Sequence, residues 1–360
     1  MKILQMTHQG DFGGSTNSIT YLAKGLAERG HDVFLACRPE SLLASRFPQG
    51  PVRCVEMRLP RGPALFAEAV RWKRWIDESG VDVVNAHASL DRHLVSYLRI
   101  LGTRAVLVHT RRNVVRSAGG WLRSRYDAAT TDAIVAVSRE VKGGLVRRGV
   151  PGGHVEVIRN GIPVSDLRRA DAEHTNALRR ILELRDGVPV VGVVARRKQQ
   201  QDLLAAAARL ARPLEILLAG VTEDADLAQR IATLPEGVRV RCLGFRDDVP
   251  EISALLDVFV LPSAIEGFSL ALLEAMARGL PCVATDAGGN AEALAEGAGR
   301  VYAPGDVAAL ASELARLLDH PADARALGDR ARERVLREFD VSSTVERTLA
   351  LYDRLVGSRA

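Results

Sequence analysis

The sequence predicts an α/β protein with two doubly wound, Rossmann-like domains that face each other across a cleft. Short apolar runs rich in Val and Ile alternate with longer amphipathic stretches, as parallel strands and crossover helices do. The chain also has 360 residues, which suits two domains better than one.

The strand candidates fall into two series. The first series is Lys2–Thr7, Asp32–Cys37, Val81–Ala86, Ala105–His109, Ala133–Val137 and Val155–Ile158. The second series is Val190–Val194, Leu214–Ala219, Val238–Leu243, Val258–Leu261 and Pro281–Thr285. Their apolar residues are mostly continuous rather than alternating, which is typical of parallel strands buried on both faces.

Helices are predicted between these strands. Residues 18–29 and 270–278 form two of them, and each ends at a glycine (Gly30 and Gly279) that supplies a left-handed terminus. The order of elements breaks after residue 160, where turn residues precede a charged stretch.

The break predicts where the domains divide. We expect an N-terminal domain over residues 1–165, an interdomain segment over 166–185 and a C-terminal domain over 186–340. The amphipathic segment at 341–360 is predicted to return and complete the N-terminal domain.

The composition is that of a folded protein with a mildly basic balance. Hydrophobic residues make up 47% and charged residues 26%, which excludes disorder, and the formal net charge is +5. This balance favours anionic partners, and we expect no nucleic acid among them. The four cysteines are far apart and form no C-x-x-C pair, so we expect neither a zinc site nor a disulfide framework. No secretory leader or long apolar span is found, and a cytoplasmic location is expected.

The most informative segment runs from Pro262 to Met276. It follows a predicted strand and enters a helix whose expected N-cap is Ser269. Glu266 would lie in the loop, where its carboxylate can accept hydrogen bonds from sugar hydroxyls. Glu274 would lie past the first helical turn, where it can take two ribose hydroxyls. The free amides of Ser269 and Leu270 suit a phosphate.

This segment resembles the signature of the group 1 glycosyltransferases, which are retaining, nucleotide-sugar-dependent enzymes with the two-Rossmann GT-B fold (glycosyltransferase family 4). That signature is a Glu, seven residues and a second Glu, and Glu266 and Glu274 match it. The flanking Pro262-Ser263, Gly267-Phe268 and Ala275-Met276-Ala277 match too. The competing interpretation is a loop carboxylate followed by a solvated helix glutamate, which a bare pair of glutamates would leave open.

The resemblance implies an enzyme that transfers a sugar from a nucleotide-sugar donor to an acceptor hydroxyl with retention at the anomeric carbon, in bacterial glycan, glycolipid or polysaccharide assembly. It assigns the donor sugar to Glu266 and the ribose to Glu274, with Gly267, Phe268, Ser269 and Leu270 also at the donor. Neither a metal nor another cofactor is expected. Asp224-Ala225-Asp226 is interpreted as the acidic start of a helix.

Positive charges for the leaving diphosphate are expected after the strand at 190–194. Arg196 matches the arginine that the family has at this strand end. The loop is shorter here, and Lys198 is assigned to the family's lysine, although a different alignment would put a glutamine there. Fixed cations stabilise a departing diphosphate more than a helix N-terminus does, whose contribution is about 0.3–1 kcal/mol.

Two further turns resemble donor-binding regions of the family. Gly13 and Gly14 belong to a glycine-rich turn after the first strand, where the backbone can approach a diphosphate or an acceptor closely. Backbone groups near Phe245 and Arg246 are predicted to contact the nucleotide base.

Polar residues at strand ends of the N-terminal half are placed to meet the donor sugar and the acceptor. His87 and Asp91 follow one strand, and His109, Arg111 and Arg112 end the next. The family commonly has a histidine near the second position that contacts the donor sugar. Arg112 aligns best with it, and His109 lies three residues upstream, so His109 is our catalytic candidate and the other four are acceptor-side candidates. A structural role for either histidine stays open.

The segment from Arg92 to Tyr126 contains eight arginines and no Asp or Glu, with Trp121 among them. One interpretation is a solvated basic face. The other is docking to an anionic membrane surface or a lipid diphosphate acceptor, which would make the protein peripheral on the cytoplasmic face of the membrane.

Two other functions remain open. A sugar-nucleotide epimerase could share the double fold, although the glutamate signature is not its pattern. A nucleotide-sugar-binding partner subunit without turnover is suggested by the shortened basic loop and the displaced histidine. A plain NAD dehydrogenase is less favoured, because no Gly-x-Gly-x-x-Gly follows the first strand of either domain.

Overall fold

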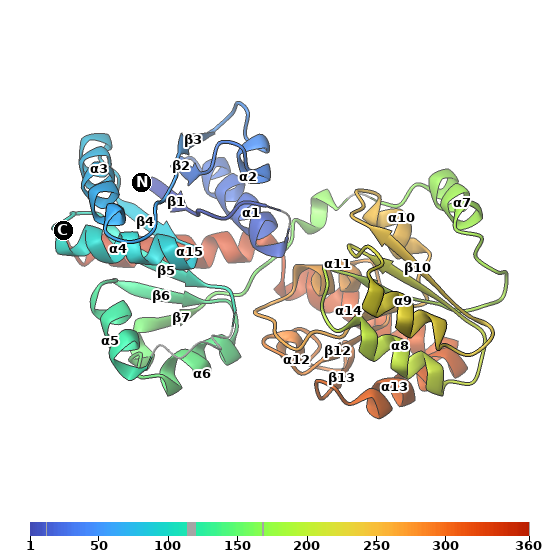
Figure 1. Cartoon of the computed structure of the whole chain (residues 1–360). Coiled ribbons are helices and arrows are strands. Elements are labelled where there is room, and N and C mark those ends of the chain that lie inside the picture. The colour runs from blue at the N-terminus through green and yellow to red at the C-terminus, as the bar shows by residue number, and fades with distance from the viewer. Residues whose placement is uncertain (12, 114–119, 168, 360) are drawn as a thin grey trace. The chain divides into compact units, whose positions relative to one another are not determined.

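The computed structural model describes the chain except for residues 12, 114–119, 168 and 360. The chain divides into two compact units (Figure 1). Unit 1 comprises Met1–Ile162 together with Val341–Ala360, and unit 2 comprises Pro163–Asp340.

Unit 1 is built on a seven-stranded parallel sheet with the strand order β3-β2-β1-β4-β5-β6-β7. The strands are β1 (Lys2–Met6), β2 (Asp32–Cys37), β3 (Val52–Glu56), β4 (Val83–Ala86), β5 (Val106–Arg111), β6 (Ala133–Ala136) and β7 (Val155–Val157). The helices are α1 (Gly14–Glu28), α2 (Leu42–Ser45), α3 (Ala64–Ser79), α4 (Ser89–Ile100), α5 (Trp121–Ala129), α6 (Arg139–Arg147) and α15 (Val341–Gly357), with a 3-10 turn at Gly152–His154.

The core of unit 1 lies on both faces of this sheet, as the continuous apolar strands predict. In β1, Ile3 packs among residues of α1 and α15, whereas Leu4 packs among residues of α3 and α4. Neighbouring residues of one strand therefore enter opposite apolar layers, because successive side chains of a strand point to opposite faces.

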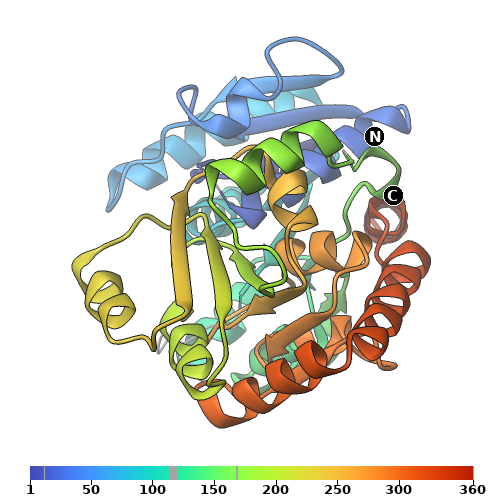
Figure 2. The same cartoon turned by 90° about the vertical axis from the view of Figure 1, so that its right-hand side faces the viewer.

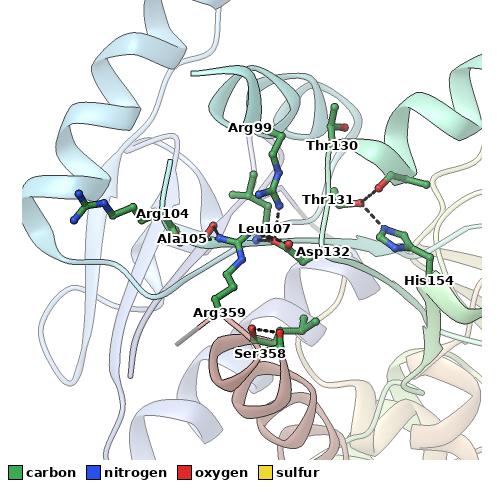
Figure 3. A network of polar contacts seen from close by, with 12 residues as sticks. Arg99, Arg104, Ala105, Leu107, Thr130, Thr131, Asp132, His154, Ser358 and Arg359 are labelled. Carbon is green, nitrogen blue, oxygen red and sulfur yellow. Dashed lines mark hydrogen bonds and ion pairs between the residues drawn. The ribbon is translucent and has the colours of Figure 1, made fainter. Parts of the chain in front are cut away.

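The C-terminal helix α15 belongs to unit 1. Its Tyr352 is fully buried. The end of the chain is also tied down, as Figure 3 shows: Arg359 Nη2 contacts both carboxylate oxygens of Asp132 at 2.7 Å, and Arg99 contacts the same carboxylate at 2.6 Å. Arg359 Nη1 donates to the carbonyl oxygens of Arg104 and Ala105. The last turn of the chain is therefore fixed to β5 and to the start of β6.

Unit 2 is built on a six-stranded parallel sheet with the order β10-β9-β8-β11-β12-β13. Its strands are β8 (Val190–Val194), β9 (Leu214–Ala219), β10 (Val238–Gly244), β11 (Val258–Leu261), β12 (Cys282–Thr285) and β13 (Arg300–Tyr302). Its helices are α7 (Ala172–Ile181), α8 (Gln200–Arg209), α9 (Ala225–Ala232), α10 (Val249–Ala254), α11 (Leu270–Ala277), α12 (Asn290–Ala293), α13 (Val307–Asp319) and α14 (Pro321–Glu338), after a 3-10 turn at Val164–Asp166. Helices α13 and α14 follow each other around the outside of the unit (Figure 2).

The predicted fold class, two Rossmann-like α/β domains, is confirmed by these two parallel sheets. The sequence prediction did not include β3 and β13. Both are edge strands, and residues such as Arg53 and Glu56 in β3 face solvent, so neither carries the continuous apolar run of a central strand. Within the described residues, no helix has the length and apolar character needed to cross a membrane.

Two cysteines that are far apart in the sequence meet in the sheet. Cys37 ends β2 and Cys54 lies on the neighbouring β3, where its thiol donates to the carbonyl oxygen of Phe47 at 3.8 Å and interacts with the thiol of Cys37. This contact lowers the pKa of Cys54 to about 7 and, with burial, raises the pKa of Cys37. All four cysteines are free thiols.

Candidate functional site

Each sheet has one point where the strand order reverses, and ligands of such folds bind beyond the carboxyl ends of the strands there. In unit 2 this point lies between β8 and β11, which pair directly. Lys198 follows β8 and Glu266 follows β11. Their side chains meet, with Lys198 Nζ 2.8 Å from Glu266 Oε1. Two predicted site residues that are far apart in the sequence are therefore brought together at the reversal point of unit 2.

The carboxylate of Glu266 is held in place from a second side. The hydroxyl of Ser263 donates to the same Oε1 atom at 2.8 Å, and Thr285 Oγ1 donates to the carbonyl oxygen of Ser263 at 2.6 Å. These bonds connect the end of β11 to the end of β12, so Glu266 has a fixed position before any ligand binds.

The basic loop after β8 is fastened by a glutamine. The side chain of Gln200 is fully buried, accepts from the backbone N–H of Lys198 at 2.7 Å and donates to the carbonyl oxygen of Arg196 at 3.0 Å. It is therefore Lys198 that faces Glu266, while the glutamine lies beneath the loop. The side chain of Arg196 is exposed and makes no hydrogen bond or ion pair within the part of the chain that the structure describes.

Arg197 points to a different partner. Its guanidinium contacts Asp226 at 2.6 Å and Asp224 at 3.3 Å, at the start of α9. Asp224 also caps this helix by accepting from the N–H of Leu227. The Asp-x-Asp pair thus serves the helix start and an ion pair. No group of three or more potential metal ligands occurs among the described residues.

The start of α11 lies next to Glu266. Ser269 caps the helix, with its hydroxyl accepting from the N–H of Leu272 at 3.4 Å. First-turn amides of a helix lack an intrahelical acceptor, so those at Ser269 and Leu270 suit an anion. The side chain of Phe268 is only 4% exposed and packs on Phe339, with ring centroids 5.2 Å apart. Phe268 therefore anchors this loop in the core of unit 2.

Glu274, one turn into α11, is half-buried. Burial raises the pKa of its carboxyl, and the nearby Arg278 opposes that shift. At the end of β10, Phe245 is 65% exposed, and Arg246 donates from Nε to Asp248 at 2.7 Å. This bond raises the pKa of Arg246.

Sequence reasoning missed a glycine pair that supports the Glu266 loop. Gly288 has φ +60°, and a Cβ atom there would lie 2.1 Å from the carbonyl oxygen of Glu266. The next amide, of Gly289, donates to the carbonyl oxygen of Gly267 at 2.8 Å. Only glycine permits both the left-handed backbone and this close approach. The available signal was a Gly-Gly pair in the turn after a predicted strand, as at Gly13 and Gly14.

In unit 1, two predicted acceptor-side residues belong to one buried network. Arg112 donates from Nη2 to His87 Nδ1 at 3.1 Å, and His87 Nε2 then donates to Gln5 Oε1 at 2.7 Å. The phenol oxygen of Tyr352 accepts from Gln5 at 3.4 Å and from Asn85 at 2.8 Å. Burial, followed by the charge of Arg112, holds the pKa of His87 well below its usual range. Both ring nitrogens of His87 are therefore committed inside unit 1.

His109 lies within β5, two residues before its end, and is fully enclosed. Its two ring nitrogens have no hydrogen-bond partner among the described residues. Burial, followed by the charges of Arg92 and Arg111, lowers the pKa of His109 well below its usual range. A catalytic role for His109 stays a prediction, and its enclosure argues against direct contact with a substrate. Arg111 is also buried, 3.6 Å from Asp127.

Asp91 is hydrogen-bonded to His8, a histidine that was not among the site residues predicted from the sequence. Its buried carboxylate accepts from the N–H of His8 at 2.9 Å, from His8 Nδ1 at 2.7 Å and from the N–H of Ala88 at 2.8 Å. His8 follows β1 and Asp91 begins α4 after β4, so the pair spans the reversal point of unit 1. The signal was a histidine directly after the first predicted strand.

The glycine-rich turn of unit 1 begins α1. Gly13 has φ +145° and is the N-cap of this helix, which Gly14 begins. Asp11 is held by Arg38 at 2.7 Å. Phe12 of this turn, and residues 114–119 of the arginine-rich segment, lie outside the described residues.

Two family profiles and a curated relative match this chain. A family profile described as "Glycosyltransferase Family 4" matches residues 12–166, and one described as "Glycosyl transferases group 1" matches residues 186–320. The N-acetyl-alpha-D-glucosaminyl L-malate synthase of Bacillus anthracis is 26% identical over 356 residues, which cover 94% of this chain and 93% of that relative.

Two solved structures have the same fold. A glycosyltransferase from Rickettsia africae has a TM-score of 0.87 at 20% identity, with 99% of this chain and 98% of that chain covered. HepE of Anabaena, solved in complex with UDP, has a TM-score of 0.83 at 21% identity, with 98% and 100% covered.

The two Rossmann-like units define a protein of the GT-B fold class. The chain belongs to the group 1 glycosyltransferases, glycosyltransferase family 4, whose members are retaining enzymes that use nucleotide-sugar donors. The family resemblance and the enzyme class predicted from the sequence are thereby confirmed.

Proposed function

We propose that the donor binds at the reversal point of unit 2, and the contact between Lys198 and Glu266 carries this assignment. Lys198 and Arg196 would hold the diphosphate together with the amides at Ser269 and Leu270. Glu266 would accept hydrogen bonds from the sugar hydroxyls. Glu274 would take the ribose, and backbone groups near Phe245 and Arg246 the base.

The reaction that follows needs no protein nucleophile. The bond between the anomeric carbon and the β-phosphate oxygen breaks, and the acceptor oxygen bonds to that carbon on the same face. The acceptor's proton passes to the departing phosphate oxygen, which preserves configuration. Negative charge grows on the diphosphate as the bond breaks, so fixed cations stabilise this transition state more than the ground state.

We propose a uridine nucleotide as the donor base. The structural neighbour HepE is solved with UDP and with UDP-glucose, which supports this choice. The acceptor would bind to unit 1, at the edge formed by Gly13, Asp91 and Arg112.

The experiment that tests the donor site compares UDP-, GDP- and ADP-sugars by thermal shift. A true donor raises the melting temperature by mass action. We expect a UDP-sugar to do so, and Lys198→Gln to weaken its binding at least tenfold. Arg197→Gln is the matched control, because its cation is paired with α9 instead. Equal binding by K198Q would refute the site.

The products of the reaction distinguish a transferase from the two alternative functions, an epimerase and a partner subunit without turnover. A transferase releases nucleotide only as acceptor or water takes the sugar, and proton NMR of the product gives retained anomeric configuration. An epimerase would change the sugar while it stays on the nucleotide. A partner subunit without turnover would bind the nucleotide sugar with normal affinity and release nothing with any acceptor.

We also propose that unit 1 docks on an anionic membrane surface, during glycan, glycolipid or polysaccharide assembly on the cytoplasmic face. On α5, Trp121 and Leu122 are 61% and 77% exposed, and Arg125 lies over the Trp121 ring at 5.7 Å. Exposed apolar side chains beside arginines suit a lipid interface. Sedimentation with anionic vesicles at low salt should retain the protein, and Leu122→Glu should release it. A wild-type protein that stays in the supernatant would exclude this docking.

A further inference from the structure

A pocket in unit 1 holds a cation without a counter-charge. It lies beyond the carboxyl ends of β4, β5 and β6, between α1 and α15, and Arg112 lines it. The other polar lining residues are uncharged: Ser18, Asn85, Thr110, Asn160, Thr344 and Thr348. No Asp or Glu is among the residues that line this pocket.

The guanidinium of Arg112 is fixed by neutral groups alone. Nη1 donates to the hydroxyl of Ser18 and, at 3.2 Å, to the amide oxygen of Asn160. Nη2 donates to His87 Nδ1 at 3.1 Å. His87 stays uncharged because its Nδ1 accepts from Arg112 and because burial disfavours its protonation. Burial also lowers the pKa of Arg112 to about 10, as expected for a cation that lacks a carboxylate.

Three of the five N–H groups of Arg112 are used by these contacts, and two are left. One of the two is Nε–H, which is shielded from solvent and has no acceptor among the described residues. The other is on Nη2. These two nitrogens form one edge of the planar guanidinium, the kind of edge that binds carboxylates and phosphates through two parallel hydrogen bonds.

Burying a charge is costly unless it is paired, so a cation held in this way calls for an anion. We propose that the Arg112 pocket binds an anionic group, phosphate or carboxylate, of the acceptor. This assignment to the acceptor rests on the proposed function, whereas the anion site itself does not. The network from His87 through Gln5 to Tyr352 would keep the guanidinium in position before the anion arrives.

The Arg112 pocket predicts a preference for acceptors with an anionic group, which the donor site in unit 2 does not predict. The donor diphosphate would contact Lys198 and Arg196 in unit 2, whereas the acceptor's anionic group would contact Arg112 in unit 1. An acceptor that carries a phosphate or a carboxylate should then be used at least tenfold better than the same sugar or alcohol without it, and Arg112→Gln should abolish that preference.

The test uses the full chain and two probes, inorganic phosphate and L-malate, at constant ionic strength. Binding is followed by thermal shift and by the ¹H–¹⁵N signal of Arg112 Nε, which is assigned by its loss in Arg112→Lys. We expect at least one probe to stabilise the wild type and to shift the Nε signal. The probe that binds more tightly identifies the anion as a phosphate or a carboxylate.

Four variants locate the binding. Arg112→Gln should weaken it at least tenfold, and Arg112→Lys should weaken it at least threefold because the paired N–H edge is lost. Arg104→Gln is the matched control on an exposed arginine of unit 1 and should leave binding unchanged. Lys198→Gln removes phosphate binding at the donor site and should leave the Arg112-dependent part intact.

Some results would overturn the proposal. An Nε signal that moves with neither probe would do so, even if Arg112→Gln failed to fold. Equal probe binding by wild type and a folded R112Q variant would do so as well. Titration of UDP into the same samples tests the proposed function separately. If the wild type binds no UDP, or Lys198→Gln binds UDP as tightly as the wild type, while Arg112-dependent anion binding is intact, the donor assignment is rejected and the anion site stands.

Discussion

At the scale of single residues, the candidate donor site depends on side chains that hold one another. Glu266 is positioned by Lys198 and Ser263, and Lys198 is positioned through the backbone by Gln200. The fixed geometry is useful because preorganised charges need no rearrangement as the diphosphate departs. The same contacts mean that a substitution at one of these residues also displaces its neighbours.

This coupling predicts non-additive kinetics. Lys198→Gln and Glu266→Gln should each lower kcat by about 10²–10³ with the identified donor, in the range found for removal of a single stabilising group. The double variant should lose much less than the product of the two single losses, because each substitution already disrupts the other side chain. Steady-state release of nucleotide measures all three. Strictly multiplicative losses would mean that the two residues act independently.

A second prediction concerns Gly288. Gly288→Ala should displace the Glu266 carbonyl, since an added Cβ would lie 2.1 Å from its oxygen. We expect donor affinity to fall at least tenfold. Gly305→Ala is the control, because Gly305 has a similar backbone (φ +82°) but nothing within 4 Å of the added Cβ. Calorimetric titration of the donor separates crowding from backbone strain. Equal losses in both variants would show that strain alone matters.

At the scale of elements, the sequence predicted the central strands and the bounds of α11 well, whereas α1 begins four residues before its predicted start. Apolar runs such as Val190–Val194 and caps such as Ser269 are determined locally, by burial and by one hydrogen bond. The edge strand Val52–Glu56 was missed because three of its five residues face solvent. The pairs His8–Asp91 and Lys198–Glu266 connect strands that are distant in sequence, so no local pattern could show those contacts.

The strand ends of unit 1 make its stability sensitive to acid. His87 and His109 stay neutral in the fold, whereas in the unfolded chain a histidine takes up a proton with a pKa of about 6.5. Below that pH the unfolded state therefore binds more protons, so the free energy of unfolding falls as pH falls, by at most about 1.4 kcal/mol per pH unit for each histidine.

Substitution of one histidine should reduce that slope. His109→Met removes one buried titratable ring whose nitrogens have no partner, so the chain should stay folded and lose less stability between pH 6.5 and pH 5. Denaturant melts at several pH values measure the slope. His174→Gln, at an exposed position, should leave it unchanged. The same variant tests catalysis: an H109M enzyme with full turnover would remove His109 from the catalytic candidates.

At the scale of the whole molecule, the chain passes from unit 1 to unit 2 and back again. Unit 2 is one continuous segment, whereas unit 1 needs both ends of the chain. Tyr352 of α15 reaches the centre of the network that holds Arg112, and Arg359 is fixed to Asp132 (Figure 3). The last residues of the sequence are therefore part of the proposed acceptor site's support.

Removal of α15 should affect the two units differently. A chain that stops at Asp340 should keep hydrogen-exchange protection in unit 2 and lose much of it in unit 1, which would expose Ile19 and Leu26. Tyr352→Phe is the milder companion. It leaves the amide donors of Gln5 and Asn85 without their shared acceptor and should cost about 1–3 kcal/mol. Unaltered exchange of unit 1 in the shortened chain would contradict this role of α15.

Because the chain returns to unit 1 at its C-terminal helix, the two units are expected to finish folding during synthesis in the reverse of the usual order. Domains commonly fold one after another from the N-terminus as they are synthesised. Here unit 2 can be complete while unit 1, begun first, still waits for its closing helix, with the apolar side chains that Tyr352 will cover left open. During synthesis, the apolar surface of unit 1 that α15 covers is therefore expected to stay accessible to chaperones until α15 has been made. A chain terminated before α15 would contain a folded unit 2 and an incomplete unit 1.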